Sequence, residues 1–395
     1  MNRSLRGERY TAHTGILQLM DDLGSAQSGA KKKYMLGGGN PALIPEAAAL
    51  WRRRMREILD NGDQFDRMVG VYDAPQGRPR FLKALAERLS TEFGWPVTER
   101  NIAVTNGSQT AFFMLFTLFA GPHADGTRRK MLFPLLPEYI GYRDQPEDTR
   151  DIVANRPKIE VIDEHTHKYQ IDFDTLRVTE DTAAICVSRP TNPSGNVLTD
   201  EEIRRLDTLA RDRDVPLIID NAYGAPFPDI IFQPVTPIWN ENIIYSMSLS
   251  KIGLPSLRTG FLIAGEETAA ALSAMNAVFS LTNGTVGQTL VEDLLTSGEL
   301  LDLSRSVIGP YYQAKSERVV AAVHRHFGDA FPYSVHRSEG SFFLWIWFAE
   351  LPGTTRELYD RLKARDVIVV PGEYFFFGND EPWEHRDRCI RVNYA

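Results

Sequence analysis

Lys251 lies in a setting that differs from that of an ordinary surface lysine. The stretch YSMSLSKIGLPSLRTG (245–260) places it among hydroxyl groups, glycine and proline, and Arg258 follows it. A lysine that is partly desolvated and close to other cations can form a Schiff base with a carbonyl group. The hydroxyl groups of Ser248 and Ser250, together with Arg258, would suit a phosphate dianion. Taken alone, a lysine is still more often a surface side chain than a nucleophile.

Three further polar clusters each come directly after a short apolar run. TNGS at 105–108 could hold an anion on backbone amides, although a serine before a helix is usually only an N-cap. Asn192, in SRPTNPSG, could donate to a ligand oxygen or simply be part of a rigid turn. Asp220 and Tyr223, in DNAYG, offer a phenol and a carboxylate able to stabilise a protonated ring nitrogen. Together with Lys251, these groups fit one ligand, pyridoxal 5′-phosphate (PLP).

The elements that must position these clusters are short apolar runs, which alternate with helices from about residue 100 onward. Continuous apolar strands between helices are typical of a mostly parallel sheet buried on both faces. Ligands of such sheets bind at the carboxyl ends of the strands, which is where the polar clusters fall. The runs are NIAV, KMLFPL, IEVIDE, AAICV, VPLII, NIIYSM and TGFLIAG.

The length of 395 residues suits one large domain and a smaller one. We expect residues 1–45 to be an N-terminal segment that joins the small domain, and residues 46–285 to form the large PLP-binding domain. Residues 286–395 would form a small α+β domain. The predicted fold class is therefore α/β, with a mostly parallel sheet in the large domain.

Composition and charge exclude several classes of protein. A hydrophobic content of 43% with 24% charged residues is that of a soluble globular chain. The net charge of −8 argues against nucleic acid or an anionic membrane as a partner. The most apolar run, 111–121, is shorter than the roughly 20 residues of a membrane span. With only Cys186 and Cys389 as cysteines, a reducing compartment, and hence the cytoplasm, is expected.

His165 and His167, in DEHTHKY, have a spacing seen in metal sites, but no further ligand cluster follows in the sequence. A solvated loop is the better interpretation of this stretch. We expect no metal.

The chain resembles a known family, the class I aminotransferases of PLP fold type I. The longer motifs PEYIGY, SRPTNPSG and DNAYGAPFP resemble those of its valine–pyruvate branch. The resemblance runs nearly end to end and rests on HTGILQLMDDL, MLGGGNPALIPE, YDAPQG, TNGSQTAFF, FPLLPEYIGY, CVSRPTNPSGNV, IDNAYGAPFP, MSLSKIGLP, FLWIWF, RLKARDVIVVPG and RVNY.

The resemblance implies a role for each cofactor residue. Lys251 would hold PLP as a Schiff base and shuttle the catalytic proton, and Asp220 would pair with the ring nitrogen. Asn192 and Tyr223 would hydrogen-bond the phenolic oxygen of the ring. The remaining cofactor contacts would be Tyr139 on the ring face, and Gly107, Ser108, Gln109, Ser248, Ser250, Arg258 and, from the partner subunit of a homodimer, Tyr72 at the phosphate.

The resemblance also implies the substrate contacts and the reaction. Arg391 would clamp the substrate α-carboxylate, assisted by Asn192 and by the backbone amide of Gly39. Phe376 and Phe377 are expected to cover the substrate side chain. The amino group would move between a small aliphatic L-amino acid (valine or alanine) and a 2-oxo acid (pyruvate or 2-ketoisovalerate) in a ping-pong reaction.

One departure from the family is that its members continue for about one more helix beyond the RVNY strand, where this sequence ends at Ala395. Either the sequence is truncated or this member lacks the helix.

Two alternatives remain open. The same scaffold could host a lyase, a decarboxylase or an aminotransferase for an unusual amino acid of a biosynthetic pathway. A ligand-sensing regulator would carry a DNA-binding domain ahead of the fold, yet only about 30 residues precede LGGGNP and the charge is acidic. The preferred donor and acceptor, the pathway and the side-chain pocket stay open.

Overall fold

The computed structural model describes residues 2–12, 17 and 33–395. The motif HTGILQLMDDL (13–23), apart from Leu17, lies outside the described residues. The chain divides into two compact units. The first comprises Met1–Gly39, Phe116–Leu198 and Ala314–Ala395, and the second comprises Asn40–Leu115 and Thr199–Gln313. Each unit is made of segments that are far apart in the sequence, whereas the predicted domains follow the chain in order. The division into the predicted domains stays a prediction.

The second unit contains four neighbouring strands, all fully buried. In order across the sheet they are β2 (Ile102–Thr105), β11 (Gly260–Ile263), β10 (Ile243–Ser248) and β9 (Leu217–Asp220). β9 and β10 are parallel, whereas β11 is antiparallel to both of its neighbours. Burial on both faces explains why these runs are continuously apolar. Because β9 and β10 run the same way, the polar residues that follow them emerge at the same edge.

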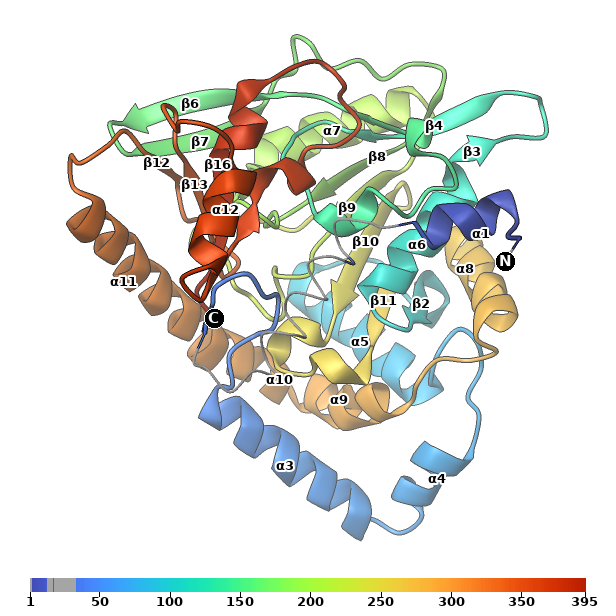
Figure 1. Cartoon of the computed structure of the whole chain (residues 1–395). Helices are drawn as coiled ribbons and strands as arrows, with labels where there is room; N and C mark the ends of the chain where they lie inside the picture. The colour runs from blue at the N-terminus through green and yellow to red at the C-terminus, as the bar shows by residue number, and fades with distance from the viewer. Residues whose placement is uncertain (1, 13–16, 18–32) are drawn as a thin grey trace. The chain divides into compact units, whose positions relative to one another are not determined.

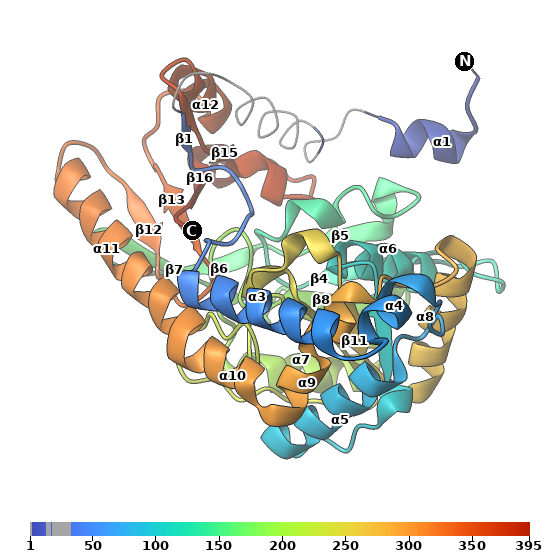
Figure 2. The same ribbon diagram turned by 90° about the horizontal axis from the view of Figure 1, so that it is seen from below.

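Helices cover the strands of the second unit. α3 and α5 begin with Pro45 and Pro79 in the first turn, where proline is favoured. α5 buries Phe81, Leu85 and Leu89 on one face, and α9 contacts α3, α4 and α5 (Figures 1 and 2). The helices are α3 (Pro45–Asp60), α4 (Gln64–Gly70), α5 (Pro79–Phe93), α7 (Asp200–Asp212), α8 (Glu266–Phe279), α9 (Val286–Ser297) and α10 (Glu299–Leu303), with α6 (Ser108–Phe119) and α11 (Gly309–Phe327) beginning here.

The first unit contains a six-stranded sheet and a set of parallel strands (Figure 1). The sheet has the order β15 (Val370–Pro371), β16 (Cys389–Asn393), β13 (Phe343–Trp347), β12 (Ser334–His336), β7 (Thr166–Ile171) and β6 (Pro157–Asp163). β8 (Thr182–Ser188) and β5 (Ile152–Ala154) both pair in parallel with β4 (Arg128–Phe133), which also pairs with β3 (Gly121–Pro122). The remaining elements are α1 (Leu5–Tyr10), α12 (Thr355–Lys363) and the pair β1 (Tyr34–Met35) and β14 (Val367–Ile368).

Two expectations about residues 157–171 are wrong. IEVIDE falls in β6, which pairs antiparallel with β7 in the six-stranded sheet rather than with the parallel strands. DEHTHKY is not a solvated loop, because most of it forms β7 and the side chain of His167 is fully buried. Pairing with β12, more than 160 residues away in sequence, buries this strand.

The mostly parallel α/β class is confirmed. Every strand that precedes one of the four polar clusters has at least one parallel neighbour, except β2, whose neighbour β11 is antiparallel. Among residues 2–12, 17 and 33–395, no helix combines the length and the apolar character needed to cross a membrane.

Candidate active site

Lys251 lies in a single helical turn that follows β10. The turn spans Ser250–Ile252 and ends at Gly253, which has the left-handed backbone conformation that favours glycine. The amide of Leu249 donates to the carbonyl of Thr259, which ties the start of this segment to the residues before β11. The half-buried side chain of Lys251 places Nζ 5.5 Å from the centre of the Tyr223 ring. The predicted pair of Lys251 and Tyr223 is therefore brought together.

Asp220 is the last residue of β9, and its side chain is only 8% exposed. It lies beside Ser246 of β10, and its Oδ1 accepts a hydrogen bond of 3.0 Å from the amide of Ala222. A carboxylate removed from water is costly unless donors or a cation compensate it. Its position at the strand end therefore suits a positively charged ligand group.

Ser248 and Ser250 form a small hydroxyl cluster between β10 and Lys251. Ser248 Oγ donates to Ser250 Oγ over 2.9 Å and accepts from the amide of Ser250 over 3.0 Å. The two predicted phosphate contacts are thus neighbours at the carboxyl end of β10.

Gly107 and Arg258 approach each other so closely that a side chain would not fit. A Cβ at position 107 would lie 2.8 Å from Cζ of Arg258, and Gly107 has a φ of +87°. A Cβ on Gly260, likewise, would lie 2.6 Å from the amide nitrogen of Ser108. Ser108 begins the 12-residue helix α6, with Gln109 exposed in its first turn. A helix N-terminus facing a guanidinium, with no Cβ between them, is a shape that fits a phosphate group.

In the first unit, Arg391 of β16 is almost fully buried and makes two short hydrogen bonds. Its Nη1 donates to Oδ1 of Asn192 and its Nη2 donates to the carbonyl of Gly37, both over 2.7 Å. Its guanidinium carbon lies 4.3 Å from the centre of the Phe343 ring and 5.1 Å from that of Phe375. The structure thus brings together the two predicted side-chain ligands of the substrate carboxylate.

Gly39 follows a backbone segment that β16 holds in place. Nδ2 of Asn393 donates to the carbonyl of Gly38 over 2.6 Å. The backbone amide of Asn393 donates to the carbonyl of Leu36. Residues 36–38 are therefore tied to the strand that carries Arg391.

Tyr139 lies at the start of the short turn Ile140–Tyr142, with its ring centre 5.3 Å from that of Tyr142 and perpendicular to it. Sequence reasoning missed its neighbour, Glu138, a buried carboxylate that accepts hydrogen bonds from Ser188 and from the amide of Tyr139. The local sequence contains no signal of its burial, because its donors come from Ser188, 50 residues later.

Tyr72 lies between α4 and α5, and 79% of its surface is exposed. Phe376 and Phe377 are buried, and the nearest aromatic rings are those of Trp345 and Trp383 for Phe376 and that of Phe133 for Phe377. This packing accounts for both phenylalanines, and their contact with substrate stays a prediction.

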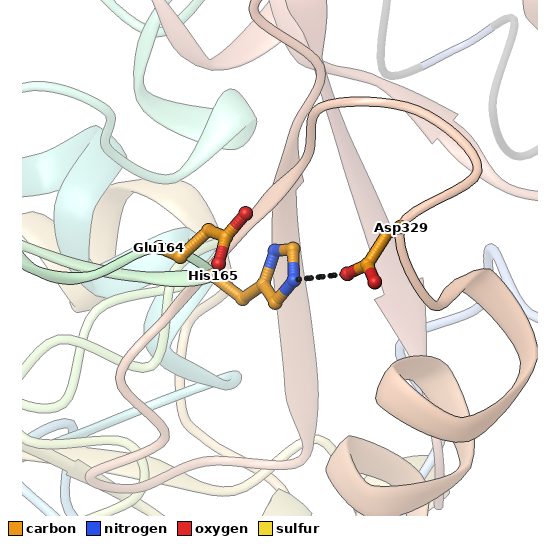
Figure 3. A group of neighbouring side chains, drawn as sticks. All are labelled: Glu164, His165 and Asp329. Carbon is orange, nitrogen blue, oxygen red and sulfur yellow. Dashed lines mark ion pairs between the residues drawn. The ribbon is translucent and has the colours of Figure 1, made fainter.

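A group of possible metal ligands lies in the first unit, away from these residues in sequence. Within the described part of the chain, Glu164, His165 and Asp329 are the one group whose ligand atoms all lie within 4.8 Å of one another (Figure 3). His165 Nε2 is 3.8 Å from Oδ1 of Asp329, and its ring stacks on Tyr333. Both carboxylates are exposed, so an ordinary surface ion pair accounts for the group. His167 is not part of it, since its Nδ1 faces Ser334 Oγ.

The chain is similar to known aminotransferases over most of its length. The family described as "Aminotransferase class I and II" matches residues 51–395. Valine–pyruvate aminotransferase of Escherichia coli K12 is 48% identical over 397 residues, covering 100% of this chain and 94% of that protein.

Solved structures give the same result. The crystal structure of valine–pyruvate aminotransferase AvtA from Salmonella typhimurium LT2 has 46% identity and a TM-score of 0.88, covering 96% of this chain and 94% of that one. A protein from Psychrobacter arcticum 273-4 that carries the name of an amino-acid aminotransferase has 41% identity and a TM-score of 0.97, covering 100% and 94%. The resemblance noted from the motifs and the predicted fold type I are confirmed. The chain belongs to the class I and II aminotransferases.

Proposed function

We propose that this protein is a PLP-dependent aminotransferase that moves an amino group between valine or alanine and the 2-oxo acids pyruvate or 2-ketoisovalerate. The observation that carries the proposal is the half-buried Lys251 beside Tyr223, with the buried Asp220 at the end of the neighbouring strand. The substrate pair is supported by the valine–pyruvate aminotransferase of E. coli, at 48% identity.

The residues of the second unit fit the phosphate and ring of PLP. The contact between Gly107 and Arg258 supports a phosphate held by the amides of Gly107, Ser108 and Gln109, with Ser248, Ser250 and Arg258 as further donors. Asp220 and Tyr223 would address the ring nitrogen and the phenolic oxygen, with Asn192 as a second donor to that oxygen and Tyr139 on the ring face.

When bound, PLP supplies an aldehyde that reacts with primary amines and a ring that draws electrons away from the substrate α-carbon. Lys251 would then move the catalytic proton: its neutral Nζ accepts the proton from the substrate α-carbon and donates it to the carbon that keeps the amino group. Asp220 keeps the ring nitrogen protonated, because a nearby carboxylate favours the cationic form. Tyr223, next to Lys251, would hydrogen-bond the phenolic oxygen of the ring and so orient it.

Arg391 selects substrates that have a free α-carboxylate. Its guanidinium carbon lies over the rings of Phe343 and Phe375, and one of its nitrogens already donates to Asn192. A planar fork held in this way binds a carboxylate in a fixed orientation. The amide of Gly39 would donate to the same carboxylate. The keto acid product leaves before the second keto acid binds, since both use Arg391.

We also propose a homodimer in which Tyr72 reaches the phosphate of the partner subunit. Tyr72 is exposed, as are several apolar side chains on α4, α8 and the segments that follow them. Hydrogen bonds from Thr285 to Met68 and from Asn283 to Pro75 join these segments. The exposed apolar side chains are Val69, Val71, Val278, Phe279 and Leu281, and a dimer interface would cover such residues. Two free, buried cysteines support a reducing compartment, and we propose the cytoplasm.

A direct test incubates the purified protein with PLP, L-valine and pyruvate. The proposal expects alanine and 2-ketoisovalerate in equal amounts. With L-valine alone, an aminotransferase converts the bound cofactor to its amine form once and stops, whereas a lyase or decarboxylase continues to release product. Continued turnover with one substrate, or no product with any aliphatic donor, would contradict the proposal.

A further inference from the structure

Glu138 is a buried carboxylate at the centre of three hydrogen bonds in the first unit. Only 1% of its surface is exposed. Oε1 accepts from the amide of Ser188 over 2.9 Å, and Oε2 accepts from Oγ of Ser188 over 2.6 Å and from the amide of Tyr139 over 3.2 Å. A short O–H···O⁻ bond of this kind is charge-assisted and stronger than a neutral one.

These bonds fix the end of β8. Ser188 is the last residue of that strand, and its carbonyl accepts from Oγ1 of Thr191 over 3.1 Å. The turn continues through Asn192 and closes with hydrogen bonds between Thr191, Gly195 and Asn196. The carboxylate of Glu138 therefore anchors the first residue of the turn that presents Asn192 to Arg391.

The backbone of Glu138 makes a third connection. Its amide donates to the carbonyl of Phe375 over 3.0 Å. The ring of Phe375 is one of the two that flank the guanidinium of Arg391. Glu138 thus contacts the segment of Tyr139, the turn of Asn192 and the aromatic support of Arg391.

The chemistry of these contacts calls for a carboxylate. All three donors point at its two oxygens, and an ionised carboxylate only accepts hydrogen bonds at both. A glutamine would have to turn an NH₂ group toward at least one of these donors. Such a donor–donor conflict in a buried place leaves a polar group unsatisfied.

We propose that Glu138 is a positioning residue, which sets the orientation of Tyr139 and of the Asn192 turn toward the cofactor and the substrate carboxylate. The inference rests on the proposed function, because it assigns Tyr139 to the cofactor and Asn192 and Arg391 to the ligand. It adds a residue that touches neither ligand and acts through those that do.

The test compares Glu138→Gln and Ser188→Ala with wild type and with Glu147→Gln, a control in the same unit whose exposed carboxylate pairs with Arg6. Four quantities are measured well below the melting temperature: the Kd of the apoprotein for PLP, the pH dependence of the bound-cofactor absorbance, kcat, and KM for the amino acid. For Glu138→Gln we expect a loss in PLP affinity and in kcat/KM on the order of tenfold to a hundredfold, with a shifted absorbance titration. Ser188→Ala, which keeps its backbone donor, should show a smaller change in the same direction, and Glu147→Gln should match wild type.

A purely structural role would lower the melting temperature of Glu138→Gln and leave the other measurements at wild-type values, which would overturn the inference. If Glu138→Gln does not fold, the Ser188→Ala variant tests the inference. Wild-type PLP affinity and a wild-type absorbance titration in Ser188→Ala would then overturn the inference. A wild-type protein that takes up no PLP would remove the proposed function and this inference with it.

Discussion

Arg391 donates a hydrogen bond of 2.7 Å from Nη1 to Oδ1 of Asn192, although 199 residues separate them in sequence. The opposite nitrogen, Nη2, is held by the carbonyl of Gly37. With these two hydrogen bonds, and its carbon over the rings of Phe343 and Phe375, the guanidinium is held in one orientation before any ligand arrives. This preorganisation reduces the conformational entropy that the Arg391 side chain would otherwise lose when a carboxylate binds.

Replacing Arg391 by lysine keeps the positive charge but removes the planar fork. The ammonium cannot donate to Asn192, Gly37 and a substrate carboxylate in the same geometry. Since a charge-assisted hydrogen bond contributes roughly 1.5–3 kcal/mol, we expect kcat/KM for L-valine to fall by about 10- to 150-fold, mainly through KM. Arg386→Lys, a more exposed arginine on the segment before β16, serves as the control and should change little. Steady-state kinetics in which both variants behave alike would contradict the assignment.

Gly107→Ala tests the contact with Arg258. The new Cβ would displace the guanidinium, and the φ of +87° adds strain of about 1 kcal/mol. Gly94 is a matched control in the same unit, with a φ of +68° and no atom within 4 Å of the position that a Cβ would take. Both alanine variants should lose a similar amount of free energy of unfolding, but only Gly107→Ala should bind PLP more weakly. Fluorescence titration of the two apoproteins measures this, and equal affinities would show that the contact is not part of a phosphate site.

The long helices and the buried strands could be predicted from sequence because their signals are local. Proline in the first turn and a regular apolar face are local signals of α3 and α5, and continuous apolar runs are local signals of β8, β9 and β10. The strand β7 could not be predicted in this way, since its polar sequence is buried only by pairing with β12. Glu138 was missed for the same reason. A glutamate between proline and tyrosine resembles a surface residue until Ser188, 50 positions later, supplies its donors.

Acid should destabilise the protein through three buried histidines. Burial lowers the pKa of His167 and of His385 to about 3, and the pKa of His336 is also lowered well below its usual value, mainly by burial. These groups are neutral in the fold, whereas the unfolded chain binds protons as pH falls below about 6.5. Stability is therefore lost as pH decreases from about 6.5 toward 3, by up to about 1.4 kcal/mol per pH unit for each histidine.

The contribution of one histidine to the pH dependence of the free energy of unfolding is measured by urea unfolding of variants between pH 7 and 5. His167→Gln should reduce the number of protons taken up on unfolding by about one, which makes the pH dependence less steep. The control His326→Gln, at an exposed residue of α11, should leave the pH dependence unchanged. Equal slopes for wild type and His167→Gln would show that His167 is not buried in its neutral form.

The ion pair of Lys168 and Glu339 should contribute strongly to stability. Both side chains are buried, and Lys168 Nζ also donates to Asn196 Oδ1 and to the carbonyl of Val197. Lys168→Met leaves a buried carboxylate without its main cation, which costs about 3–5 kcal/mol. Lys158→Met, at an exposed pair with Asp174, should cost less than about 1 kcal/mol. Urea unfolding checks both values, and similar losses would argue against a buried pair.

The central claim, that Lys251 is the residue to which PLP attaches, is tested most directly by borohydride reduction. Protein saturated with PLP is reduced, digested and sequenced by mass spectrometry, with Lys251→Ala treated in parallel. We predict one phosphopyridoxyl group per chain, located on Lys251, and none in the variant. A label on another lysine, or an equal label in Lys251→Ala, would contradict the account.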